Sequence, residues 1–164
     1  NFLGLRKKNF NVSIVRGFTF VGKYLPQNSI YLIGNLIENI INKKNLIFNS
    51  NKRIIRSYMY VDDFVRCIIK IIQNKQTNGD VYNVGSDDPI DSNLLLNKLS
   101  KKYNLRIIKN KINKNKVDYY VPNIKKIRKK LNFKLKKKSY EAIIKTINLL
   151  KINWNKICFE KKFD

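Results

Sequence analysis

Two short β-branched runs, set among segments with helical spacing, constrain the fold more than any other feature of the sequence. Asn11–Arg16 and Val81–Val84 are short and mainly apolar, which is typical of buried strands. Residues 30–42 and 62–73 instead carry apolar side chains three and four positions apart, as amphipathic helices do. This alternation predicts an α/β fold, and 164 residues suffice for one domain with a core.

Further elements follow from the same patterns. Residues 45–48, 54–61, 106–108 and 117–121 are predicted to be extended, and residues 2–9, 123–131 and 140–150 to be helical. Asp62 and Asp63 are expected to cap one helix, Asp91 or Ser92 to cap another, and the tail after Asn153 to be weakly organised. The residues predicted to face the core from the helices are Ile33, Leu36, Ile37, Ile40, Ile41, Phe64, Cys67, Ile68, Ile71, Ile72, Leu94, Leu95 and Leu99.

The charge balance is extreme, with 35 Lys and Arg against 11 Asp and Glu and a formal net charge of +24. Such an excess is typical of proteins that meet nucleic acid, anionic membranes or other acidic partners. However, only seven of these residues are Arg, and the chain holds 24 Asn, a bias that an AT-rich genome also produces. The lysines are scattered along the chain, which favours compositional drift over a selected polyanion surface.

The sequence excludes several kinds of chemistry within these 164 residues. It contains no His, and Cys67 and Cys158 lie far apart, so that structural zinc and His-based acid–base catalysis are excluded here. No apolar run is long enough to span a bilayer, and no signal peptide is recognisable. We expect a cytoplasmic protein, and since the chain begins at Asn1 without Met we expect a fragment of a longer one.

Four blocks resemble one family. Residues 12–22, VSIVRGFTFVG, resemble the strand and loop that follow the catalytic Tyr-x-x-x-Lys in extended short-chain dehydrogenases. Residues 55–63, IRSYMYVDD, resemble that family's Arg-Ser/Asp-Tyr/Phe-x-Tyr/His-Val-x-Asp segment, and residues 81–86, VYNVGS, its Tyr-Asn-x-Gly strand. Residues 120–133 resemble its late Pro-Asp … Leu-Gly-Phe segment. In order and spacing the blocks are similar to the NAD-dependent nucleotide-sugar epimerase/dehydratase family, and closest to its 4,6-dehydratase-like members.

The resemblance implies a C-terminal portion of such an enzyme. It implies that residues 1–22 and 62–86 form the C-terminal edge of a Rossmann sheet. Residues 23–61 and 87–152 then form a small mixed α/β substrate-binding domain, and residues 153–164 a tail. The implied cofactor is NAD, the implied partner is a nucleoside-diphosphate sugar, and a homodimer is possible for the intact enzyme. The chain contains neither the Gly-x-x-Gly-x-x-Gly loop nor the Tyr-x-x-x-Lys pair, so that no catalytic residue is predicted and this portion alone is expected to be inactive.

The resemblance also implies binding residues. Arg56 corresponds to the Arg that contacts the diphosphate, for which a guanidinium fork is suited, although an ion pair with Asp62 or Asp63 is the alternative. Leu46 and Phe48 correspond to the strand beside the nucleobase, with plain core packing as their alternative. Asn35 and Tyr24 correspond to positions near the sugar and phosphates. On the cofactor side, the resemblance points to Arg16, which can equally form a structural pair, and to Phe18.

The departures from the family keep other functions open. The usual Gly-Asp-Gly turn is Ser50-Asn51-Lys52, the Gly of Leu-Gly-Phe is Asn132, the Asp after the late Pro is Asn123, and a frequent basic residue is Tyr119. Within the family, an epimerase, decarboxylase or reductase fits as well as a dehydratase. Outside the family, two hypotheses stay open: a small basic nucleic-acid-binding protein, which the scattered lysines disfavour, and the remnant of a decayed gene.

Overall fold

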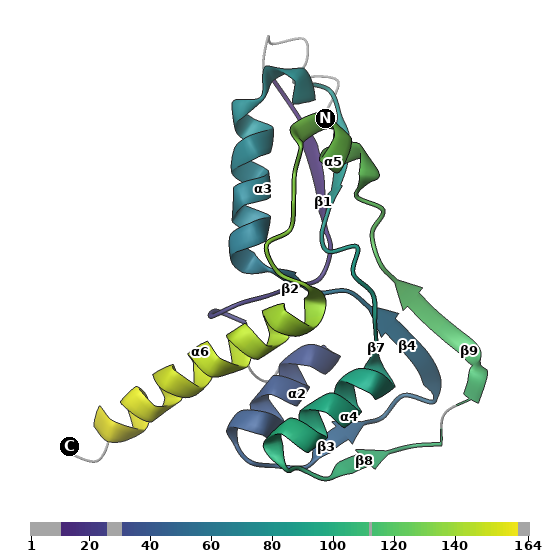
Figure 1. Ribbon diagram of the computed structural model, residues 1–164, viewed down its shortest axis with the longest axis vertical. Coiled ribbons are helices and arrows are strands. Elements are labelled where there is room, and N and C mark those ends of the chain that lie inside the picture. Colours follow the sequence, from purple (N-terminus) through teal and green to yellow (C-terminus); the bar gives the residue numbers. More distant parts are fainter. Residues whose placement is uncertain (1–10, 26–30, 112, 161–164) are drawn as a thin grey trace.

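The computed structural model describes residues 11–25, 31–111 and 113–160, and Figure 1 shows that these form two lobes. The predicted helix at residues 2–9 lies outside the described part. We name the lobes after their main strand pairs: the β1–β6 lobe, at the top of Figure 1, and the β4–β9 lobe below it. The mixed α/β architecture confirms the predicted fold class.

The β1–β6 lobe is built around two parallel strands. Its elements are β1 (Ile14–Gly17), α3 (Val61–Gln73), the 3-10 turn η1 (Lys75–Thr77), β6 (Val81–Val84) and α5 (Lys125–Leu131). β1 and β6 pair in register, with Ile14 opposite Val81 and Gly17 opposite Val84. Apolar side chains of α3, β6 and α5 bury one another: Cys67, Ile71, Tyr82, Val84, Ile124 and Ile127 are all in this core, together with Met59, Leu131 and Phe133.

The β4–β9 lobe combines a three-stranded mixed sheet with three helices. Its elements are α2 (Leu32–Ile41), β3 (Leu46–Phe48), β4 (Lys52–Arg56), β7 (Ile90–Asp91), α4 (Ser92–Tyr103), β8 (Ile107–Lys109), β9 (Asn113–Tyr120) and α6 (Ser139–Glu160). β4 is the middle strand, antiparallel to β7 and parallel to β9, while β3 and β8 form a separate parallel pair. The short parallel pair β2 (Phe20–Val21) and β5 (Met59–Tyr60) lies between the two lobes.

A buried polar cluster fixes the start of α6 at this junction. Ser139 donates its hydroxyl to the carbonyl of Asp88 at 2.5 Å, and its backbone N–H donates to the Asp88 carboxylate at 2.8 Å. The same hydroxyl accepts from the backbone N–H of Tyr58 at 2.9 Å. α6 continues to Glu160, so that regular helix extends past Asn153, where a weakly organised tail was expected.

Helical periodicity predicted most of the buried residues correctly, but it wrongly placed two exposed residues in the core. Ile33, Leu36, Ile37 and Ile40 of α2 are buried as predicted. On α4 the buried leucines are Leu95, Leu96 and Leu99, and Leu94 is 60% exposed, so its predicted place in the core is wrong. Ile72, at the last turn of α3, is also exposed rather than buried. Leu94 and Ile72 each lie one position from a buried residue, Leu95 and Ile71, and one step along a helix turns a side chain about 100° away from the buried face.

The predicted capping role of Asp62 and Asp63 is wrong, because both lie within the first turn of α3 and neither caps it. α3 begins at Val61 without a side-chain cap, and Asp63 is buried inside its first turn. Its carboxylate pairs with Arg66 and accepts hydrogen bonds from the backbone N–H groups of Lys136 (2.9 Å) and Lys137 (3.3 Å). Asp63 therefore has a structural role. It anchors the loop that joins α5 to α6, which lies more than 70 residues later in the chain.

Candidate functional site

The ladder between β4 and β9 gathers four side chains on one face. Its register sets Ile54 opposite Asp118 and Arg56 opposite Tyr120. Side chains two residues apart on a strand point to the same face, so these four share a face, while Arg53, Ile55 and Tyr119 lie on the other. The sequence alone could not show this, because the two strands are more than 60 residues apart.

Arg56 is held by a bidentate ion pair with Asp118. Its Nη2 donates to Oδ2 at 2.8 Å and its Nη1 to Oδ1 at 3.0 Å, and Nη1 also donates to the backbone carbonyls of Ile55 (3.1 Å) and Asp118 (3.0 Å). The side chain of Arg56 is 22% exposed and that of Asp118 is 44% exposed. The hydrogen bond from Arg56 lowers the pKa of the Asp118 carboxyl group below its usual value. The alternative partners expected from the sequence, Asp62 and Asp63, pair with Lys145 and Arg66 instead.

An aromatic stack continues from this pair toward the β1–β6 lobe. The Arg56 guanidinium lies 5.7 Å from the centre of the Tyr120 ring, within the range of a cation–π contact. The Tyr120 ring stacks on Phe18, with the ring centroids 4.8 Å apart and the planes 27° from parallel. Arg56, predicted for the substrate, and Phe18, predicted for the cofactor, are therefore linked through one tyrosine.

Phe18 lies where parallel strands end, the usual place for ligands in an open α/β sheet. Its backbone N–H donates to the carbonyl of Val84 at 2.8 Å, directly after β1 and β6 finish. Gly85 permits this approach, because a Cβ there would lie 2.8 Å from the Phe18 Cβ and 2.8 Å from the Pro122 Cγ. Arg16 is exposed on β1 opposite Asn83, and it forms no salt bridge with any residue that the structure describes.

A cavity of about 460 Å³ borders the other end of the same face. It is lined by Asn35 and neighbouring residues of α2, by Phe48 and its neighbours on β3, and by Ile54 of β4, two positions from Arg56. Asn35 and the Leu46–Phe48 strand, both predicted for the substrate, thus meet at one hollow. The side chains of Leu46 and Phe48 point into the core, however, and Ile47 between them is 45% exposed, so the strand can present only its backbone and Ile47 to a ligand.

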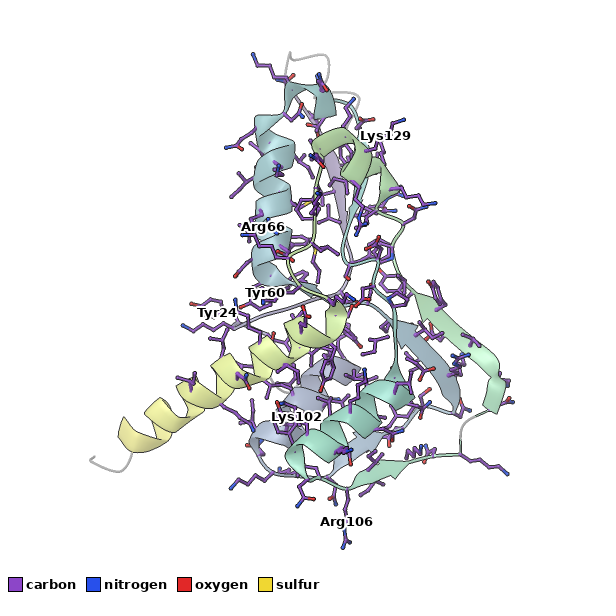
Figure 2. The ribbon with its side chains drawn as sticks, in the orientation of Figure 1. Tyr24, Tyr60, Arg66, Lys102, Arg106 and Lys129 are labelled. Atoms are coloured by element: carbon purple, nitrogen blue, oxygen red, sulfur yellow. The ribbon has the colours of Figure 1, made fainter. Side chains whose placement is uncertain are left out.

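Tyr24 is the predicted substrate residue that the fold does not bring to this group. It is 86% exposed at the end of the β2 segment, with the Lys23 ammonium over its ring. Figure 2 places Tyr24 beside α6, across the molecule from β4 and β9. Asp118 and Tyr120 were not predicted as site residues; their spacing within an extended segment indicates a shared face, but not that Arg56 lies opposite.

The described residues fit only part of NAD. Phe18 and Arg16 stand at the carboxyl ends of the parallel strands, a suitable place for one end of a dinucleotide, whereas the 164 residues contain no glycine loop to hold its pyrophosphate. In the part of the chain that the structure describes, no cluster of His, Cys, Asp or Glu could hold a metal ion, and no helix is long and apolar enough to cross a membrane.

The similarity to solved structures covers almost the whole chain. The epimerase Mth375 from Methanothermobacter thermautotrophicus superposes with a TM-score of 0.79 and 16% identity, over 95% of this chain and 48% of that one. UDP-glucose 4-epimerase from Thermotoga maritima, solved with UDP-glucose, gives a TM-score of 0.79 and 17% identity over 93% and 50%. dTDP-glucose 4,6-dehydratase from Bacillus anthracis, solved with NAD, gives a TM-score of 0.76 and 16% identity, over 93% of this chain and 48% of that one. The chain thus spans about half the length of the structures that it matches.

The sequence comparison agrees with the fold. No curated protein matches the chain. Residues 5–85 match the family described as the NAD dependent epimerase/dehydratase family, a stretch that includes Arg16, Phe18, Asn35, Arg56 and Gly85. The Rossmann-like fold of the neighbouring structures confirms the predicted fold class. The chain therefore matches the NAD dependent epimerase/dehydratase family in sequence over residues 5–85, and over nearly its whole length it shares the fold of epimerases and a dehydratase of known structure.

Proposed function

We propose that this chain is the nucleotide-sugar-binding portion of an NAD-dependent dehydratase or epimerase. One observation carries the proposal: Arg56 presents its guanidinium on a face that runs from the cavity at Asn35 and Phe48 to Phe18. A nucleoside diphosphate needs a cation for its phosphates and a hollow for its nucleoside, and these lie at adjoining positions along β4. The Thermotoga maritima epimerase, which was solved with UDP-glucose, supports this class of ligand.

Each group has a distinct part in this proposal. Arg56 binds the diphosphate, while Asn35 and the backbone of β3 line the hollow for the nucleoside. Phe18 and Arg16 face the cofactor, which supplies hydride transfer at the sugar when it is bound. The Gly-x-x-Gly-x-x-Gly loop and the Tyr-x-x-x-Lys pair are absent from the 164 residues, so we propose that the chain alone binds ligand without turnover. The family resemblance leaves dehydration, epimerisation, decarboxylation and reduction as alternative outcomes, and it is compatible with a homodimer of the whole protein.

Calorimetry of the purified full chain with UDP and with dTDP tests the diphosphate site. We expect Arg56→Ala to weaken binding at least about tenfold, because a hydrogen bond to a charged group contributes roughly 1.5–3 kcal/mol. Arg53→Ala is the matched control: Arg53 is an Arg of the same strand that also pairs with an Asp, but on the opposite face. It should leave the affinity within about twofold, as expected for a charge outside the site.

Two results would overturn the proposal. One is no detectable heat for either nucleotide with a chain that is folded by circular dichroism. The other is equal loss of affinity in the Arg56 and Arg53 variants, which would show that the high net charge, and not a particular site, attracts the nucleotide. A steep fall in affinity with added salt for both variants would point to the same nonspecific attraction.

A further inference from the structure

Two different sets of groups hold Arg56, and they differ in what they do to its charge. The backbone carbonyls of Ile55 and Asp118 accept from Nη1 and fix the guanidinium in place. The carboxylate of Asp118 covers both Nη1 and Nη2 and neutralises the charge. Removing the carboxylate alone therefore leaves the two carbonyl contacts that position the side chain.

We propose that Asp118 is a built-in counter-ion that limits how tightly Arg56 binds a diphosphate. This inference rests on the proposed function. The end of the guanidinium that bears Nη1 and Nη2 is the fork that a phosphate group grips with two parallel bonds, and the Asp118 carboxylate occupies it. A phosphate that takes this fork must displace the carboxylate, and one that approaches beside it meets a like charge.

The exposure of the two partners makes such an exchange feasible. Asp118 is 44% exposed, so its carboxylate can rotate into water without becoming a buried unpaired charge. Arg56 is less exposed and rests on the Tyr120 ring, and it therefore stays in place when its partner leaves. The pair contrasts with that of Asp63, which is buried and also bonded to two backbone N–H groups.

The counter-ion also determines which anions the site accepts. A ligand with a single carboxylate would only replace the Asp118 carboxylate by an equivalent group. Because such a ligand also loses translational freedom on binding, the exchange has no favourable free energy. A diphosphate brings more negative charge and more acceptor oxygens to the same fork, and it can bind where the carboxylate does not. Asp118 is thus a specificity-determining residue that acts through Arg56 in favour of phosphorylated ligands.

Asp118→Asn tests this inference by calorimetry of the full chain with UDP. The variant keeps the backbone carbonyl and nearly the same shape but removes the charge, and we expect UDP to bind about fivefold more tightly, the scale of one partly exposed ion pair. The matched control is Asp91→Asn, because it changes the net charge equally and removes the carboxylate partner of Arg53 on the other face of β4. Asp91→Asn should leave UDP affinity within about twofold.

A double-mutant cycle separates the counter-ion from other causes of the same gain. The increase caused by Asp118→Asn should disappear in an Arg56→Ala background, because Asp118 acts only through that guanidinium. If Asp118→Asn leaves UDP affinity equal or weaker while Arg56→Ala weakens it, the counter-ion role is wrong and the carboxylate only positions Arg56. A gain in Asp91→Asn as large as in Asp118→Asn would also overturn it. If Arg56→Ala has no effect at all, the proposed function itself fails.

Discussion

The two faces of strand β4 carry the same pair of residues in different surroundings. On one face, Arg53 donates from Nε to Asp91 at 2.7 Å; its side chain is 48% exposed, and Asp91 also caps α4 through the N–H of Asn93. On the other face, Arg56 makes a bidentate contact with Asp118, is braced by two carbonyls and rests on Tyr120. Identical chemistry thus serves helix capping on the first face and presents a fixed cation on the second.

The difference comes from what lies beyond each pair. The Arg53 face leads to α4 and to a wider hollow of about 700 Å³ lined by Lys109 and Lys111. The Arg56 face is continuous with the cavity at Asn35 and Phe48 at one end and with Phe18 at the other. An Arg–Asp pair is therefore informative about function only when its neighbours are known, since either pair alone is typical of a surface ion pair.

The largest effect is expected from Gly85→Ala. Gly85 lies where the β1–β6 lobe meets the face of β4 and β9 that carries Arg56 and Tyr120. The new Cβ would lie 2.8 Å from the Phe18 Cβ and from the Pro122 Cγ, and neither atom is the end of a flexible side chain. We expect a loss of about 1–3 kcal/mol in the free energy of unfolding, as for other overpacked sites. Denaturant unfolding measures this loss, and UDP binding should weaken too, because the Phe18–Tyr120 stack shifts.

Gly17→Ala is the comparison for this prediction. Its Cβ would meet only the far end of the Phe64 ring, at 3.3 and 3.4 Å, and that ring can give by a small rotation. The loss of stability should therefore be smaller than for Gly85→Ala. Equal losses for the two variants would show that the close approach at Gly85 has no special place in joining the lobes.

Local patterns in the sequence were sufficient for the elements but not for the site. The strands at Ile14–Gly17 and Val81–Val84 and the helix face of Ile33, Leu36 and Ile37 follow from spacing alone. The predicted burial of the first strand is wrong, because three of its four residues are exposed. The partner of Arg56 does not, because Asp118 is 62 positions away and reaches it only through the register of β4 with β9. Leu46 and Phe48 were placed beside the ligand by resemblance, and the fold turns their side chains into the core.

The departures from the family pattern are compatible with the fold. Asn132, where the family has Gly, ends α5 in the left-handed region at φ 44°, which Asn tolerates better than most residues. Ser50 replaces a turn Gly, and its hydroxyl accepts from the N–H of Lys52 at 3.0 Å. Asn123, in place of Asp, accepts from the N–H of Lys125 at 3.0 Å. These residues could not be judged from the sequence, because their effect depends on backbone angles.

A smaller effect is expected from the aromatic ring that supports Arg56. Tyr120→Ala removes the ring that packs against both Arg56 and Phe18, and UDP binding should weaken by about threefold to fivefold, the scale of a partly exposed cation–π contact. Tyr119→Ala is the matched control, because Tyr119 is an exposed tyrosine of the same strand on the Arg53 face. Equal losses in the two variants would remove the functional distinction between the faces.

The smallest expected effect concerns acid stability, where the two faces should behave alike. The hydrogen bond from Arg56 lowers the pKa of Asp118 below 3.8. Burial by itself would raise the pKa of Asp91. Hydrogen bonds from Arg53 and from the N–H groups of Asn93 and Leu94 together outweigh burial, so that the pKa of Asp91 is also below its usual value. A carboxyl group whose pKa is lower in the folded than in the unfolded chain stabilises the fold at pH values above its pKa in the unfolded chain. This stabilisation is lost as the pH falls through the pKa of the folded chain.

The stability of Asp118→Asn should therefore approach that of the native chain as the pH falls from 5 to below 3.8. At pH 5 the deficit of the variant is expected to be under about 1 kcal/mol, because the pair is partly exposed to water. Asp91→Asn should converge in the same direction, since Asn can still cap α4. Urea titrations at both pH values measure the two deficits. A deficit that widens in acid would mean that Arg56 does not stabilise the ionised form of Asp118, and the structural basis for treating Asp118 as the counter-ion of Arg56 would then be lost.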